Sequence, residues 1–149
     1  DNTFVEGWAL YGEEMLMRQG LYAAESPGYA QVLRLGRYRA ARIGVDVNLQ
    51  TGRWTFEQAV KYFMEAGGLD REAAEGEAAG AAASPSQKIG YMVGKWQVMR
   101  LLGKYRDQQG DSFRLGAFHD QLIGYGSLPV SVIEWLMFDD ASSLDAAVK

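Results

Sequence analysis

The sequence contains no cysteine, one histidine and three prolines in 149 residues. Without cysteine, neither a disulfide framework nor a thiolate metal site can form. Basic runs are also absent and the net charge is −4, so we expect no nucleic-acid partner. No apolar run reaches the roughly 18 residues that a membrane span requires, and we expect no such span.

The chain shows no signal-peptide pattern, and its first residue is Asp1 rather than methionine. A helical pattern starts at once, which is typical of a cut or processed edge. Hydrophobic residues make up 48% of the sequence, enough for a real core in one domain or in a piece of a larger one. We expect a soluble protein and leave open whether it works in the cytoplasm or in the cell envelope.

Helical periodicity and capping signals predict an all-α fold of about six or seven helices. The expected helices begin near Asn2, Pro27, Thr55, Arg71, Pro85, Phe113 and Leu128. Ser26, Thr55 with Gln58, and Asp70 are candidate N-caps, and Ser84 with Gln87 resembles a capping box.

The helix expected over 85–109 carries apolar residues at helical spacing, so we predict that they belong to the core: Ile89, Met92, Val93, Trp96 and Met99. Gly90 and Gly94 would let another helix approach closely. Residues 71–83 contain almost only alanine, glycine and glutamate, which predicts a mobile surface segment. We divide the chain into a helical region, 1–138, and a frayed tail, 139–149.

Two carboxylates interrupt an otherwise apolar first helix. Glu6 and Glu13 lie seven residues apart on one stripe, and an ionised carboxylate is costly to bury without a partner. One interpretation leaves both side chains in solvent or pairs them with arginines. The other uses Glu6 in a metal or substrate site.

The second helix carries a polar face made of Arg39, Arg42, Asp46 and Gln50 within roughly 80° of arc. Arg42 and Asp46 have the spacing of a helical ion pair, worth only a few tenths of a kcal/mol at a surface. A solvated charged face and a functional site are both compatible with this pattern.

Several segments resemble one known family. Phe4–Glu13, FVEGWALYGE, resembles F-x-E-G-W-A-L-Y-x-E of the bacterial domain-of-unknown-function 885 family. Three later blocks follow in the same order: YRAARIGVD with RWTFEQA (38–46 and 53–59), PSQKIGYMVGK (85–95) and the segment 118–130, which resembles F-H-D-x-L-L-x-x-G-x-L-P-L. Members of that family resemble helical zinc metallopeptidases of the gluzincin kind. The resemblance implies that the chain is part of a larger helical bundle of zinc-peptidase type.

The resemblance also implies roles for individual residues. Glu6 corresponds to the third zinc ligand, and Arg42 with Asp46 corresponds to a pair that orients the site. His119 and Tyr91 are candidates for catalytic contacts to substrate. Substrate-binding candidates are Arg39, Arg42, Asp46 and Gln87. For two of these residues a structural role is equally open, because a lone histidine is often a hydrogen-bonded structural residue and Tyr91 could be a core tyrosine.

The sequence departs from the family pattern at three places. Gln50 stands where the family carries histidine, and Gly80 and Ala81 stand where it carries an Arg-Tyr pair placed for substrate or oxyanion contacts. No H-E-x-x-H segment is present, so a catalytic zinc site would lack its histidine pair. We therefore expect zinc in the intact parent protein and none bound by this chain alone.

Together these observations predict the C-terminal part of a zinc-dependent peptidase-like hydrolase, inactive by itself, whose parent cleaves peptide or amide bonds. The alternative is a non-catalytic helical binding or scaffolding module derived from the same fold. If the chain is a fragment of a larger helical bundle, the apolar surface on which the missing helices packed would be exposed and would favour self-association.

Overall fold

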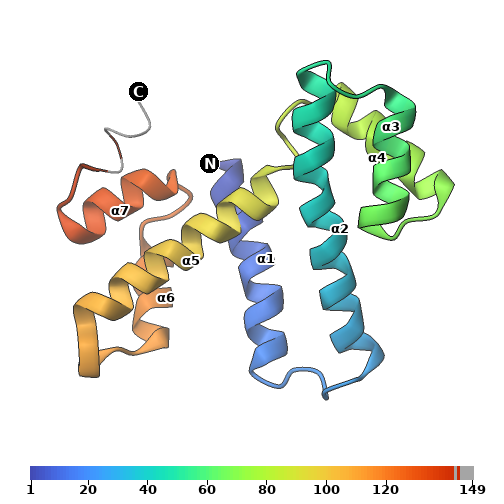
Figure 1. Cartoon of the computed structure of the whole chain (residues 1–149). Helices are drawn as coiled ribbons and strands as arrows, with labels where there is room; N and C mark the ends of the chain where they lie inside the picture. The colour runs from blue at the N-terminus through green and yellow to red at the C-terminus, as the bar shows by residue number, and fades with distance from the viewer. Residues whose placement is uncertain (143, 145–149) are drawn as a thin grey trace. The chain divides into compact units, whose positions relative to one another are not determined.

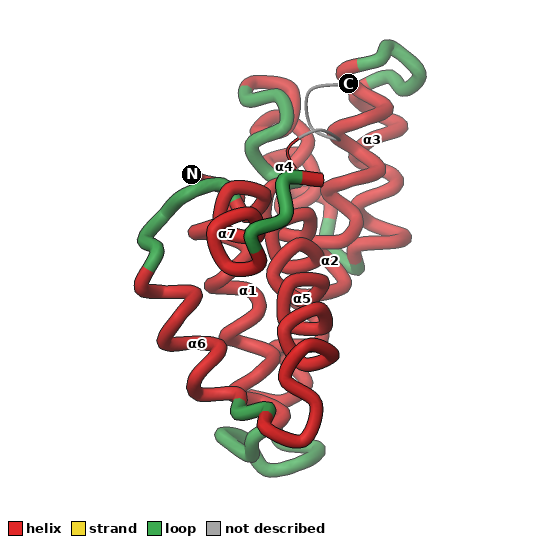
Figure 2. Tube along the Cα trace, turned by 90° about the vertical axis from the view of Figure 1, so that its left-hand side faces the viewer, coloured by secondary structure: helices red, strands yellow, loops and turns green. Residues whose placement is uncertain are grey.

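The computed structural model describes residues 1–142 and 144, and in this part of the chain all regular secondary structure is helical, without any strand (Figures 1 and 2). The all-α prediction is therefore confirmed. The elements are α1 (Asn2–Arg18), α2 (Pro27–Gln50), α3 (Phe56–Tyr62), the π-helix η1 (Phe63–Gly67), α4 (Arg71–Ala83), α5 (Gly90–Gln109), the 3₁₀-helix η2 (Gly110–Ser112), α6 (Leu115–Gly124) and α7 (Val130–Phe138). None of these helices has the length and apolar character of a membrane span. The tail expected from residue 139 falls largely on residues 143 and 145–149, which lie outside the described part.

The chain divides into two compact units. The first unit comprises residues 1–11 and the chain from residue 93 onward. The second unit comprises residues 12–92. Because the divisions fall within α1 and α5, each of these helices contributes to both units.

In the first unit, α1 meets α5 at two glycines that lack the side-chain atoms that would separate the helices. A Cβ built on Gly94 would overlap the carbonyl oxygen of Thr3, and a Cβ built on Gly7 would overlap the backbone of Gly94. The prediction that Gly94 permits close helix packing is confirmed.

The first unit buries one face each of α5, α6 and α7, together with Phe4, Leu10 and Tyr11 of α1. Its buried residues on the three later helices are Val98, Leu101, Tyr105, Phe118, Leu122, Val130 and Ile133. The prediction that Trp96 and Met99 belong to the core is wrong, because their exposed fractions are 62% and 48%. The buried stripe of α5 runs through Val98 and Leu101 instead, on a different side of the helix.

In the second unit, α3, η1 and α4 pack against α2 (Figure 1). Their shared core combines Val45, Val60 and Phe63 with alanines of α4. These alanines, Ala74, Ala78 and Ala81, recur at helical spacing and are buried. The alanine-rich segment 71–83 is thus a helix with a flat face that fits closely against its neighbours. Its mobility stays a prediction.

Three helix starts match the sequence signals. Ser26 accepts a hydrogen bond from the backbone N–H of Tyr29, and Asp70 accepts one from the N–H of Ala73. Thr55 and Gln58 form the reciprocal capping box that their spacing predicts. These caps satisfy backbone donors that a helix leaves unpaired at its first turn.

The predicted start of α5 at Pro85 is wrong. Residues 85–89 form turns and the helix begins at Gly90. Ser86 has a φ of 64°, in the left-handed region, and its backbone N–H donates a 3.1 Å hydrogen bond to Oδ1 of Asp46. A tertiary bond to a buried carboxylate therefore holds this segment in a turn, where the local capping signal favoured helix.

Candidate functional site

Glu6 lies on α1 in the first unit, partly buried. Within the described residues its carboxylate takes part in no hydrogen bond or ion pair. Glu13, the second acid of the same stripe, is paired with Arg39 of α2 at 2.5 and 3.3 Å. Pairing with an arginine, one of the two expected fates of these carboxylates, therefore applies to Glu13 and not to Glu6.

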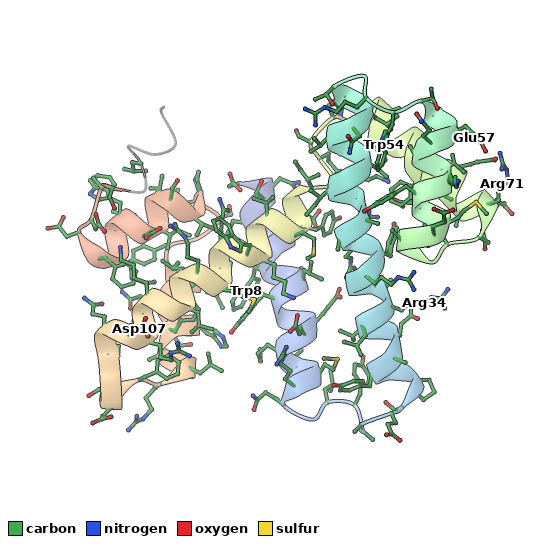
Figure 3. The ribbon with its side chains drawn as sticks, in the orientation of Figure 1. Trp8, Arg34, Trp54, Glu57, Arg71 and Asp107 are labelled. Atoms are coloured by element: carbon green, nitrogen blue, oxygen red, sulfur yellow. The ribbon has the colours of Figure 1, made fainter. Side chains whose placement is uncertain are left out.

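His119 lies on α6, and its Nε2 is 2.8 Å from the hydroxyl of Tyr11 on α1. Its ring is edge-on to both Trp8 and Tyr11, with the Trp8 ring centroid at 5.4 Å (Figure 3 labels Trp8). Burial lowers the pKa of His119, and the neighbouring Asp120 opposes this only in part. His119 is therefore neutral at pH 7 and sits in a hydrogen-bonded aromatic cluster. This is the environment expected of a structural histidine, while its role toward substrate stays a prediction.

A cluster of polar side chains lies in the second unit, where α2 faces α4. Two nitrogens of the Arg42 guanidinium, Nε and Nη2, donate to the Glu77 carboxylate at 3.1 and 3.2 Å. Lys88 donates to the same carboxylate at 2.8 Å, and Arg42 also bonds the hydroxyl of Tyr38. We call these four residues, Tyr38, Arg42, Glu77 and Lys88, the Glu77 cluster.

The electrostatics of the Glu77 cluster follow from partial burial and close charges. Burial would raise the pKa of Glu77, but hydrogen bonds from Arg42, Lys88 and Tyr38 outweigh it and lower this pKa to about 2. Burial, with a contribution from Glu77, raises the pKa of Tyr38 to about 12. At neutral pH the carboxylate is ionised and the phenol is protonated.

Arg42 does not pair with Asp46, so the predicted helical pair is not formed. Asp46 is only 3% exposed, and its Oδ1 accepts the hydrogen bond from Ser86. No described residue donates to its Oδ2. Glu77 and Asp46 are alternative partners for Arg42. Glu77 is favoured because its carboxylate accepts two hydrogen bonds from the guanidinium.

At the positions where the sequence departs from the family pattern, the structure shows contacts within the fold. The Gln50 side chain donates a 2.9 Å hydrogen bond to the carbonyl of Ala81 at the end of α4. At Gly80, a Cβ would lie 2.6 Å from Nζ of Lys88. The missing side chain at position 80 thus leaves the space that the Lys88 ammonium fills.

The remaining sequence-predicted residues of the second unit are Arg39, Tyr91 and Gln87. The guanidinium carbons of Arg39 and Arg42 are 5.8 and 5.3 Å from the ring centroid of Tyr91, within cation–π range. Gln87 is exposed in the turn that precedes α5. The structure therefore brings Arg39, Arg42 and Tyr91 together. The roles of these residues and of Gln87 toward substrate stay predictions.

Sequence reasoning missed Tyr38, Glu77 and Lys88. A usable signal existed for Glu77, since it directly precedes Ala78 on a helix whose alanines recur at 74, 78 and 81. An acid beside that flat face is placed to meet the arginines of α2. Lys88 had no local signal, because its position depends on the turn that Asp46 holds.

Metal ligands do not gather in the described residues: across 1–142 and 144, no three histidine, cysteine, aspartate or glutamate side chains lie close enough to hold an ion. Glu6 offers one carboxylate, and Nε2 of His119 is engaged by Tyr11. A catalytic zinc needs three protein ligands and an open position. The described residues alone therefore do not fit a zinc ion.

The fold and its sites define a helical protein with an unpaired carboxylate on α1 and a polar cluster between α2 and α4. Residues 1–137 match the family model DUF885, described as "Bacterial protein of unknown function", and the chain belongs to this family. A search of curated proteins gave no match.

Two solved structures are similar to the chain. One is a candidate lipoprotein from Colwellia psychrerythraea, with 34% identity and a TM-score of 0.83 over 89% of this chain. The other is a candidate lipoprotein of unknown function from Shewanella oneidensis, with 31% identity and a TM-score of 0.82 over 91%. The match covers 23% and 25% of those two chains, so this chain spans about a quarter of their length.

Proposed function

We propose that this chain is the C-terminal part of a zinc-dependent hydrolase that cleaves peptide or amide bonds. The observation that carries the proposal is the Glu6 carboxylate, partly buried on α1 within the described residues and without an internal partner. The family match and the coverage of about a quarter of the solved relatives support a longer parent protein. In this proposal, Glu6 is one ligand of a zinc ion whose other ligands the parent supplies.

The contrast between the two acids of α1 gives this proposal its physical basis. Removing an ionised carboxylate from water is unfavourable unless a cation or several donors compensate it. Arg39 compensates Glu13, and nothing described does so for Glu6. A bound zinc ion would compensate Glu6 and would supply Lewis-acid polarisation and an activated water.

Other residues of the chain would act on the substrate. In the proposal, Arg39 and Arg42 bind it electrostatically, with Arg42 oriented by Glu77 and Tyr91 lying against both guanidinium groups. Asp46, whose buried Oδ2 accepts no hydrogen bond from any described residue, and Gln87 complete the substrate contacts in this proposal. His119, neutral at pH 7, contacts the substrate by exchanging its hydrogen bond with Tyr11.

A second candidate is a non-catalytic helical module, favoured by one observation. At the positions that depart from the family pattern, the contacts stabilise the fold. Gln50 donates a hydrogen bond to the end of α4, and Lys88 fills the space beside Gly80. A protein that had abandoned catalysis could use these positions in this way. Under this alternative, the parent lacks an H-E-x-x-H segment and hydrolyses nothing.

For the location of the parent, we favour the cell envelope. The two solved structures from Colwellia psychrerythraea and Shewanella oneidensis are described as candidate lipoproteins. Fractionation of cells that express the native protein tests this, with the parent expected in the envelope fraction. Recovery only in the cytoplasmic fraction would contradict it.

Peptide hydrolysis by the longest native form of the protein tests the proposed function. We expect the E6Q variant to lose at least 100-fold in kcat/KM on a mixed peptide substrate, while E72Q keeps wild-type activity. Glu72 is a matched control because it is exposed on α4 and far along the sequence from the first motif. Hydrolysis that survives E6Q unchanged would overturn the role of Glu6. A wild-type parent without hydrolysis would support the helical module.

A further inference from the structure

A groove of about 400 Å³ opens in the second unit along α2, with its other wall formed by the end of η1 and by α4. Its volume falls within the range of small-molecule pockets. Leu35, Leu69 and Ala73 give it an apolar lining, and Gly76 contributes no side chain at all. Polar groups reach it from Gln31 and Arg34 on one side and from Tyr38 and Glu77 on the other.

The four arginines of α2 between positions 34 and 42 differ in how they are engaged. Arg37 donates to the carbonyls of Glu65 and Ala66, both at 2.7 Å, and so binds the end of η1. Arg39 and Arg42 are held by carboxylates, as described above. Among the described residues, only Arg34 of these four has no hydrogen-bond or ion-pair partner. Figure 3 shows it extending from α2 toward the side on which η1 lies.

The charged side chains that line the groove indicate which kind of ligand it can bind. At the Glu77 end of the groove, the carboxylate already accepts bonds from Arg42 and Lys88, so it has little capacity left for a ligand cation. The free group is the Arg34 guanidinium, whose planar pair of donors matches a carboxylate. One arginine beside an apolar wall fits a single negative charge attached to an apolar group better than it fits a phosphate, which usually recruits several donors.

We propose that this groove binds a small carboxylate that carries an apolar side chain, with the carboxylate on Arg34 and the apolar part against Leu35 and Leu69. The carboxyl end of a peptide and a free carboxylic acid share this chemistry. The inference does not depend on the proposed function, because Glu6 does not line the groove.

Calorimetric titration of the longest native protein with N-acetyl-leucine tests the charge requirement. We expect measurable binding that is weakened at least tenfold when N-acetyl-leucinamide, which lacks the charge, replaces the acid. R34Q should weaken binding of the acid by at least the same factor, whereas R53Q, at an exposed arginine outside the groove, should not. Equal binding of acid and amide, or unchanged binding in R34Q, would overturn the proposal, as would absence of binding at millimolar ligand.

Two further variants locate the site. A Cβ at Gly76 would meet no atom within 4 Å, so Gly76→Leu has room for its first side-chain atom, adds bulk at the groove wall and replaces a glycine inside a helix. We expect it to abolish binding, while Ala79→Leu, at another exposed position of α4 outside the groove, retains it. Retention of binding in E6Q separates the groove from a metal site. Binding lost in E6Q but retained in Gly76→Leu would contradict the assignment.

The source of the carboxylate is distinguished by peptide length. N-acetyl-Ala-Ala-Leu that binds at least tenfold tighter than N-acetyl-leucine would support a peptide end as the ligand. Equal affinity would support a free acid. Weaker binding of both than of their amides would contradict a carboxylate site.

Discussion

Arg42 and Glu77 form a two-point ion pair between α2 and α4, with Nε to Oε2 at 3.1 Å and Nη2 to Oε1 at 3.2 Å. Both side chains are largely buried, at 12% and 19% exposure. The pair fixes an alanine-rich helix that has few large side chains to anchor it. It also sets the direction of the guanidinium that the proposed function assigns to substrate.

Replacing Glu77 by glutamine should therefore destabilise the fold. Glutamine leaves Arg42 and Lys88 without their carboxylate, and removing one partner of a largely buried pair costs about 2–4 kcal/mol. Denaturant unfolding of E77Q beside E72Q measures this. E72Q should stay within about 0.5 kcal/mol of wild type. A loss below about 1 kcal/mol in E77Q would show that the pair contributes little.

The same carboxylate predicts a dependence of stability on pH. Its pKa falls from 4.5 to about 2 on folding, so the unfolded chain binds a proton more readily than the folded chain does. The stabilisation is complete above pH 4.5 and disappears as the pH falls toward 2. The free-energy difference between wild type and E77Q should shrink over this window. A difference that stays constant from pH 6 to pH 2.5 would contradict the assignment.

The contact between α1 and α5 predicts a strong effect of a single methyl group. Gly94→Ala would place a Cβ against the Thr3 carbonyl, and backbone on both sides can move little, so we expect a loss of about 1–3 kcal/mol or more. Gly103→Ala on the same helix meets no atom within 4 Å and should be neutral or stabilising by up to about 1 kcal/mol. Thermal unfolding of both variants compares them. Equal transition temperatures would show that the helices are not in close contact.

The sequence was sufficient where the determining interactions are local. Ser26, Thr55 and Asp70 cap helices through side chains that reach only a few residues, and all three could be predicted. Ser84 and Gln87 carry a similar local signal, but the backbone bond from Ser86 to Asp46, forty positions away, overrides it. A local capping signal does not produce a helix where a buried carboxylate in another helix requires a backbone donor from the same segment.

In the candidate site too, some residues could be predicted from local sequence patterns and others depend on tertiary contacts. Glu6 was identifiable because an acid interrupts an apolar stripe. The pairing of Arg42 with Glu77 instead of Asp46, and the place of Lys88 beside Gly80, depend on how α4 docks against α2. On α5, apolar residues occur on more than one side, so periodicity alone could not decide that Val98 is buried and Trp96 exposed. Such choices depend on tertiary contacts between residues far apart in the sequence.

The zinc content of the longest native protein, purified without chelator and measured by mass spectrometry, tests the central claim most directly. The account predicts about one zinc per chain in the wild type and in E72Q, and a loss of about tenfold or more in zinc affinity in E6Q with unchanged helicity. Stoichiometric zinc that E6Q retains at wild-type affinity would contradict it.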